Sequence, residues 1–157
     1  MSLNSIQNMK SPKKRILLII KGRLKMLEEK IKCLLVKPYE LPIEIEIDNT
    51  LEEKQKLVGG YIEQAFIIKD DSVVLICNEE GKINGMKPNR DIGHDIIFGP
   101  FLIVGNDFEN GGYKSLTNEQ ILNYKIRFDK HSIVQTENKI LGILLNKKSH
   151  NLNREER

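Results

Sequence analysis

The chain has 157 residues and a formal net charge of +3, with 39% apolar and 30% charged residues, a composition typical of a soluble globular protein of one domain, or two at most. The longest apolar run near the N-terminus, Ile16 to Ile20, is far shorter than the roughly 18 to 20 residues of a membrane span, and it is too short for the core of a secretory signal. These features exclude a membrane-spanning protein and argue against export, so we expect the protein to be cytoplasmic.

The charge is distributed unevenly along the chain. Residues 1–37 contain ten basic and two acidic residues, a net charge of +8, whereas residues 38–128 contain nine basic and 16 acidic residues, a net charge of −7. The last 29 residues contain six basic and four acidic residues, which adds +2. Such asymmetry is typical of an arm that binds nucleic acid or a membrane surface, or of a basic helix that lies on an acidic body.

The N-terminal segment predicts a basic amphipathic helix. Residues 1–12 are polar and predict a disordered lead. From Lys13 to Lys30, apolar residues recur at steps of three and four, the period of an amphipathic helix, at Ile16, Ile19, Ile20, Leu24 and Leu27. The opposite positions are mostly Lys and Arg. Such a helix is suited to a lipid surface or to phosphates, but we favour the interpretation in which it docks on its own domain.

Two strands are predicted next. The apolar run from Ile31 to Val36 predicts the first. Strict alternation from Ile43 to Ile47 predicts the second, with its isoleucines on the buried face and Glu44 and Glu46 on the other.

Cap and turn signals predict the elements that follow. A helix is expected over 51–57, capped by Thr50 and ended by Gly59 and Gly60, and a hairpin with strands over 61–69 and 73–77 and a turn over 70–72. After an irregular loop over 83–94, we expect a β segment over 95–104 that bends or bulges at Gly99-Pro100, a loop over 106–114, and a helix over 118–128 capped by Thr117.

Together these elements predict an α+β fold with a small, mainly antiparallel sheet and two or three helices, preceded by the basic amphipathic helix. We divide the chain into a polar lead and basic helix over 1–30, an α+β domain over 31–128, and a partly disordered extension over 129–157. In that extension, the apolar patch from Ile140 to Leu145 predicts a short helix or strand before a disordered tail.

Signatures of catalysis and of cofactor binding are missing from the sequence. Neither G-x-x-x-x-G-K-[ST] nor G-x-G-x-x-G occurs, which argues against the common nucleotide-hydrolysing and dinucleotide-binding folds. The three histidines form no metal-binding pair, and Cys33 and Cys77 lie in apolar settings typical of buried, reduced thiols. We therefore predict a non-enzymatic protein with no catalytic residue, no metal ion and no cofactor.

One polar cluster, Lys87-Pro88-Asn89-Arg90-Asp91, has the residue types of a ligand site. These five residues belong to a predicted loop and include an ammonium, an amide and a bidentate guanidinium, which could hold a small anion or a carboxylate. The alternative, which we favour, is a hydrogen-bond network that folds the loop on itself. The candidate binding residues are Lys87, Asn89, Arg90 and Asp91, with Glu44 and Glu46 on the acidic strand face.

An ordered series of motifs resembles a known family. The motifs are Leu-Val-Gly-Gly-Tyr-Ile-Glu over 57–63, Asn-Glu-Glu-Gly-Lys over 78–82, Asn89-Arg90, Asp-Ile-Ile-Phe-Gly-Pro-Phe-Leu-Ile-Val over 95–104, and Ser-Leu-Thr over 115–117. Over residues 31 to 128 the chain is similar to a small domain family of unknown function that occurs in phages, plasmids and integrative elements of Gram-positive bacteria. The resemblance implies an α+β domain with an accessory role on a mobile element, in a bacterial host cell, and no known activity.

Three functions stay open at this point. The first, which we favour by analogy with other mobile-element proteins, is an inhibitor whose acidic body binds a host or defence protein. The second is a module that binds or sequesters a small anionic, nucleotide-like ligand through the loop from Lys87 to Arg90. The third is a DNA-associated factor that uses Lys13 to Lys30, although this helix carries no aromatic residue on which bases could stack.

Overall fold

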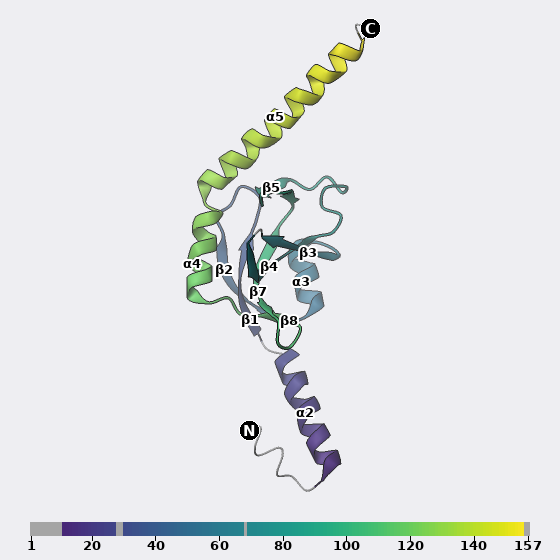
Figure 1. The fold of residues 1–157 in the computed structure, drawn as a ribbon, viewed down its shortest axis with the longest axis vertical. Coiled ribbons are helices and arrows are strands. Elements are labelled where there is room, and N and C mark those ends of the chain that lie inside the picture. The colour runs from purple at the N-terminus through teal and green to yellow at the C-terminus, as the bar shows by residue number, and fades with distance from the viewer. Residues whose placement is uncertain (1–10, 28–29, 68, 156–157) are drawn as a thin grey trace.

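An antiparallel sheet of six strands forms the centre of the protein (Figure 1). The structure, a computed structural model, describes residues 11–27, 30–67 and 69–155. Five strands lie in the order β2-β1-β7-β4-β3, and β8 pairs with the C-terminal part of β7. The strands are β1 (Lys30–Val36), β2 (Ile43–Asp48), β3 (Ile62–Ile67), β4 (Asp70–Asn78), β7 (Phe101–Asp107) and β8 (Gly112–Lys114). This architecture confirms the predicted α+β class and the mainly antiparallel sheet.

The three central strands β1, β7 and β4 are buried on both faces, which explains their nearly continuous apolar sequences. Leu34, Ile103 and Leu75 lie in register across these strands and point to one face of the sheet. Their neighbours Ile76 and Leu102 point to the opposite face, because successive side chains alternate along a strand. The sheet therefore carries two separate apolar layers.

One helix covers each of these layers. Helix α3 (Leu51–Val58) lies on one face and contributes Val58 to the apolar cluster there, and α4 (Asn118–Arg127) lies on the other (Figure 1). Helix α4 contributes Ile121 and Tyr124, and Phe128 follows it directly. The two helices and the sheet form three layers, and they account for most of the buried apolar side chains.

The helix caps are those that the sequence predicts. Thr50 Oγ1 accepts a hydrogen bond from the amide of Glu53, and Gly59 ends α3 in the left-handed conformation with φ of 81°. At the start of α4, Thr117 and Gln120 each bond the other's backbone amide and form a complete capping box. Both helices begin at the residue that the cap signal indicates.

The segment expected to be an irregular loop instead contains a short strand, β5 (Pro88–Asp91). It pairs with β6 (Ile96–Phe98), which lies in the predicted β segment, and the two form a separate two-stranded sheet. At four residues, with an irregular register after Pro88, β5 is too short to produce an alternation that sequence analysis can detect. Gly99, with φ of 81°, then turns the chain from β6 into β7, which confirms the predicted bend.

Two further boundaries differ from the prediction. The segment 70–72, expected to be a turn, is the start of β4, and the preceding Lys69 takes the positive φ of 68° that reverses the chain. Asp70 Oδ1 accepts from the amide and the hydroxyl of Ser72, so the acidic side chain stabilises the strand start. The predicted loop over 106–114 is partly sheet, because Asn106 pairs with Tyr113 across β7 and β8.

Helix α2 (Pro12–Leu27) extends away from the sheet at one end of the molecule (Figure 1). Its side chains Ile16, Leu17, Ile19 and Ile20 are 47–58% exposed. The interpretation in which the helix docks on its own domain is therefore wrong for these residues. The helix also ends before the predicted position, because Lys30 already begins β1. The polar lead predicted over residues 1–10 lies outside the described residues.

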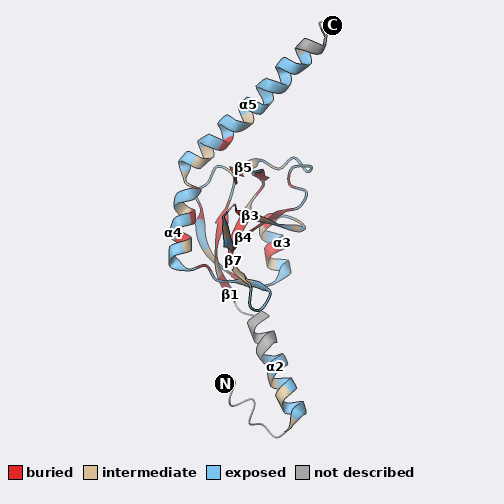
Figure 2. Cartoon of the chain, viewed as in Figure 1, coloured by how far each residue is buried: buried red, intermediate tan, exposed pale blue. Residues whose placement is uncertain are grey.

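Helix α5 (Lys130–Glu155) extends from the opposite end of the molecule (Figures 1 and 2). It is a single helix of 26 residues where we expected a short element and a disordered tail. Thr136, in its second turn, is buried against β5, whereas every residue from Leu141 to Asn151 is exposed. Within the part of the chain that the structure describes, no helix is long and apolar enough to cross a membrane.

Candidate functional site

Arg90, the strongest predicted ligand-binding residue, is completely buried, and all its donors are used within the protein. Its Nε donates to Ser132 Oγ at 2.9 Å, and its Nη1 donates to the carbonyl and the side-chain oxygen of Asn89 at 3.2 and 2.9 Å. Its Nη2 donates to the carbonyls of Glu40 and Phe128 at 2.7 and 3.1 Å. A guanidinium has five N–H donors, so none remains for a ligand. Arg90 instead joins β5 to the β1–β2 loop, the end of α4 and the start of α5.

The other residues of this cluster do not converge on a common site. Asn89 is buried, and its Nδ2 donates to the carbonyls of Val36 and Gly99 at 2.9 and 2.8 Å. Lys87 is exposed, with its Nζ 5.8 Å from the centre of the Tyr39 ring. The internal network that we favoured over a ligand site is thus present around Asn89 and Arg90, and it extends well beyond the loop.

Asp91 faces α5 and not a cavity. Its carboxylate accepts from Lys139 Nζ at 2.8 Å and from the amide of Gly93 at 2.8 Å. Partial burial acts to raise the pKa of Asp91, but these hydrogen bonds and the positive charge of Lys139 outweigh it, and the pKa lies below its ordinary value. Asp91 therefore helps to hold α5 on the body.

Glu44 and Glu46 lie on the edge strand β2, on the face that α4 covers, and both are exposed. Glu44 is within 3.5 Å of Lys32 Nζ and 3.6 Å of Lys125 Nζ, so two cations balance its charge. The register places Glu46 opposite Lys32. Exposed pairs of this kind contribute about 0.2–1 kcal/mol to stability. The acidic strand face is thus less negative than its sequence implies.

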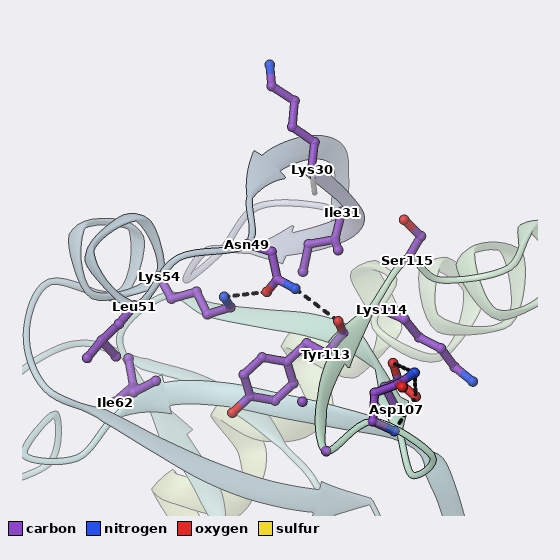
Figure 3. A pocket seen from close by; sticks show the side chains of 13 residues that line it. Lys30, Ile31, Asn49, Leu51, Lys54, Ile62, Asp107, Tyr113, Lys114 and Ser115 are labelled. Atoms are coloured by element: carbon purple, nitrogen blue, oxygen red, sulfur yellow. Dashed lines mark hydrogen bonds between the residues drawn. The ribbon is translucent and has the colours of Figure 1, made fainter. Parts of the chain in front are cut away.

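A pocket of about 700 Å³ lies elsewhere, between the start of α3 and the β7–β8 hairpin (Figure 3). Its walls come from five elements and loops that are distant in sequence. Side chains of three kinds line it: the cations Lys30, Lys54 and Lys114, the polar groups Asn49, Asp107, Asn110, Tyr113 and Ser115, and the apolar groups Ile31, Leu51 and Ile62, with Gly111 and Gly112 at the hairpin.

Lys54 is the buried cation of this pocket, with only 2% of its surface exposed. Its Nζ donates to Asn49 Oδ1 at 2.7 Å and to the carbonyl of Thr50 at 3.0 Å, and it lies 5.1 Å from the centre of the Tyr113 ring. Asn49 in turn donates to the carbonyl of Tyr113 at 3.0 Å, so the ammonium is held between α3 and β8 (Figure 3).

No negative charge compensates this ammonium within the described part of the chain. The carboxylates there that form ion pairs do so with other cations. The nearby Cys33 is no counter-ion, because burial raises the pKa of its thiol to about 12 and keeps it neutral at physiological pH. Desolvation lowers the pKa of Lys54, as expected for a cation removed from water without a partner.

The rest of the pocket divides into a charged rim and an apolar wall. Figure 3 shows the side chains of Lys30 and Lys114 at the rim, pointing away from Lys54, and Leu51 and Ile62 together on the same side of the pocket as Lys54. The hydroxyl of Tyr113 accepts a hydrogen bond from Gln64. Such an arrangement suits a ligand with an anionic group at Lys54 and a small apolar part against the wall.

Sequence analysis missed Lys54, although a signal was present. Lys54 precedes the buried Val58 by four residues and therefore lies on the same face of α3, where an apolar residue is expected. A lysine on the buried stripe of a short amphipathic helix is the detectable feature. Its partner Tyr113 is 59 positions away in sequence and shows no pattern that connects the two.

A second cavity, of about 610 Å³, lies beside β3, β4 and β6 and contains Cys77 and His94. Burial raises the pKa of the Cys77 thiol to about 11, with a smaller effect of Glu63, so the thiol is neutral and poorly nucleophilic. In residues 11–27, 30–67 and 69–155, no group of three or more His, Cys, Asp or Glu side chains is arranged to hold a metal ion.

Comparison with known proteins places the domain in a family. Neither the curated proteins nor the solved structures contain a significant match to the chain. A family profile described as "Domain of unknown function (DUF3846)" matches residues 31–129. The match begins in β1 and ends just after α4, so it includes the sheet, α3, α4, the buried Arg90 and the Lys54 pocket. The chain therefore belongs to the DUF3846 family of domains of unknown function.

Proposed function

We propose that this domain binds a small organic anion at Lys54, in the pocket between α3 and the β7–β8 hairpin. The observation that carries the proposal is the buried ammonium of Lys54, which has two hydrogen-bond acceptors but no carboxylate partner among the described residues. A buried charge without a counter-charge is costly, and proteins seldom retain one for stability alone. A bound anion would offset that cost.

Two further features support a ligand of this class. The pocket volume of about 700 Å³ is within the range of small-molecule sites. Lys30 and Lys114 at the rim add two positive charges against the one negative charge of Asp107, which favours the approach of an anion. A carboxylate or phosphate with a small apolar or planar part fits the polar and apolar surfaces of this pocket. The nucleotide-like ligand considered from the sequence was assigned to a different place, the loop from Lys87 to Arg90.

The experiment compares Lys54→Met with Lys56→Met. Lys56 lies on the same helix but is exposed and does not line the pocket, so its substitution controls for the loss of one positive charge. The probes are inorganic phosphate, adenosine monophosphate and citrate, and binding is measured by isothermal titration calorimetry and by the shift in melting temperature. Released small molecules are identified by mass spectrometry after denaturation of the purified protein.

We expect at least one probe or released anion to bind the natural protein and Lys56→Met, with about tenfold or more weaker binding to Lys54→Met. Equal binding by the two variants would show that Lys54 is not the anion site. A protein that releases no anion and binds none of the probes would also refute the proposal, since the uncompensated ammonium would then be structural.

An accessory role on a mobile element remains a prediction. If the domain has such a role, the pocket favours one in which it sequesters a small molecule of the host. The inhibitor hypothesis, in which the acidic body binds a host or defence protein, rests on the net charge of −7 over residues 38–128 and on exposed carboxylates such as Glu46. The two ion pairs of Glu44 weaken that hypothesis.

A further inference from the structure

Helix α2 exposes apolar side chains that the rest of the described chain does not cover. Ile16, Leu17, Ile19 and Ile20 are exposed by 58, 51, 52 and 47%. Exposed aliphatic residues that occur singly are normal, but four in two successive turns of one helix form a patch that calls for a partner. The helix extends away from the sheet, so the patch is accessible from solvent (Figures 1 and 2).

The charge of α2 restricts the chemistry of that partner. Pro12–Leu27 contains six basic residues and no acidic residue. At about 100° per residue, Ile16, Leu17 and Ile20 fall within one arc of about 100°, with the exposed Lys13 at the N-terminal end of this arc. The exposed Lys14 and Lys21 lie together about a quarter turn from its centre. The helix thus presents an aliphatic face flanked by cations.

We infer that α2 binds an anionic lipid surface, with its aliphatic face inserted at the boundary between headgroups and acyl chains. Helices that lie in this interface combine an apolar face with a polar face rich in Lys and Arg. The lysines of α2 would contact the phosphates while their alkyl stems follow the apolar face. This mode needs no membrane span, in agreement with the absence of a spanning helix from the described residues.

Other occupants fit the helix less well. Duplex DNA would engage the cations but leave Ile16, Leu17 and Ile20 in water, because phosphate contacts need no apolar side chains. A second copy of α2 would bring six more positive charges against the first six. A lipid surface is the partner that satisfies both the charge and the apolar face.

The charge of the body gives this binding an orientation. Residues 38–128 carry a net charge of −7, so an anionic surface repels the body while it attracts α2. This net charge would oppose close contact between the body as a whole and the membrane.

Vesicle sedimentation with the full chain tests this inference. The probe is a vesicle of phosphatidylcholine with about a quarter of phosphatidylglycerol, and vesicles of phosphatidylcholine alone are the control. We expect the protein to bind the anionic vesicles at low salt, to bind neutral vesicles far more weakly, and to dissociate at high salt.

Two variants separate the apolar from the electrostatic contribution. Ile16→Gln with Ile20→Gln removes the apolar face, and we expect about tenfold or more weaker binding to anionic vesicles. Lys14→Gln with Lys21→Gln retains that face and should weaken binding mainly at low salt. Ile83→Gln is the matched control, since Ile83 is 85% exposed but lies on the body, and it should bind as the natural chain does.

Several outcomes would overturn the inference. Failure of the full chain to bind anionic vesicles at low salt is the simplest. Undiminished binding by the double Ile variant would show that the aliphatic face plays no part. Binding to duplex DNA that the Ile variant retains and the Lys variant loses, without vesicle binding, would assign the helix to nucleic acid. A dimer that the Ile variant abolishes, again without vesicle binding, would assign it to a second copy.

Discussion

The sheet body and the two terminal helices differ in how far their apolar side chains are buried. In the body, β1, β4 and β7 bury nearly all their aliphatic side chains between α3 and α4. In α2 and in the distal part of α5, aliphatic side chains such as Ile16 and Leu144 are more than half exposed. The body is thus stabilised by its own apolar core, whereas α2 and the distal part of α5 bury few apolar side chains against it. The family match, which spans residues 31–129, coincides with the body.

A similar contrast exists within the body, between its two buried cations. Arg90 donates five hydrogen bonds and joins four segments of the chain. Lys54 donates two, both to residues within five positions of it, and lines the pocket of about 700 Å³. The two cations are buried alike but differ in how many hydrogen bonds the protein gives them. The proposal of a ligand at Lys54 depends on this difference.

The largest expected effect contrasts a core residue with a helix residue of similar character. Phe101→Ala removes a fully buried ring that packs edge to face on Phe128 at 5.5 Å, and we expect a loss of about 3–5 kcal/mol in the free energy of unfolding. Leu141→Ala, at a site that is 55% exposed on α5, should change it by less than about 0.5 kcal/mol. Urea unfolding measures both. A large effect of Leu141→Ala would show that α5 packs against the body.

The next effect concerns Arg90. Arg90→Leu leaves the carbonyls of Glu40 and Phe128 without their donor and should lower the free energy of unfolding by about 3 kcal/mol. Lys87→Leu, three residues earlier and exposed, is the control and should have an effect of less than about 0.5 kcal/mol. If Arg90→Leu were as mild as its control, the network would not stabilise the junction of β5, α4 and α5.

The smallest effect is a pH dependence at Lys54. Because the pKa of Lys54 is lower in the folded protein than its ordinary value of 10.5, the unfolded chain binds more protons between these two values. The stability of the natural protein relative to Lys54→Met should therefore rise with pH across that window. Urea unfolding of both proteins at a series of pH values measures it.

A flat difference between the two proteins would show that Lys54 keeps its ordinary pKa when folded. A saturating anion gives a second check. It should hold the ammonium protonated and reduce the rise, since the counter-charge raises the pKa of Lys54 again.

The parts of the fold that sequence analysis predicted correctly depend on local signals. Thr50, Thr117 and Gly59 mark helix ends through side-chain or backbone geometry within three residues, and the structure confirms each. Strand β5 was missed because a strand of four residues shows no measurable period. The helical C-terminal segment was missed because its polar composition suggested disorder.

The candidate site was harder to predict because it depends on contacts between distant residues. The sequence indicated Asn89 and Arg90 as a polar cluster, but only the fold shows that Glu40, Phe128 and Ser132 accept the hydrogen bonds of Arg90. Lys54 carried a signal within α3, but its position over Tyr113 depends on the pairing of β8 with β7. The prediction of the candidate site was limited by the large sequence separation of its residues more than by their types.

The bonds of Arg90 to Phe128 and Ser132 also fix the direction in which α5 leaves the body. Lys139, about two turns beyond Ser132 along the helix, adds a third contact through its hydrogen bond to Asp91. With 26 residues, α5 is about 39 Å long, and its part beyond Lys139 extends about 24 Å past the last of these contacts. The contacts of Arg90 and Lys139 therefore set the direction of that part relative to the sheet. Loss of the Arg90 contacts would alter not only the stability of the domain but also the direction of α5.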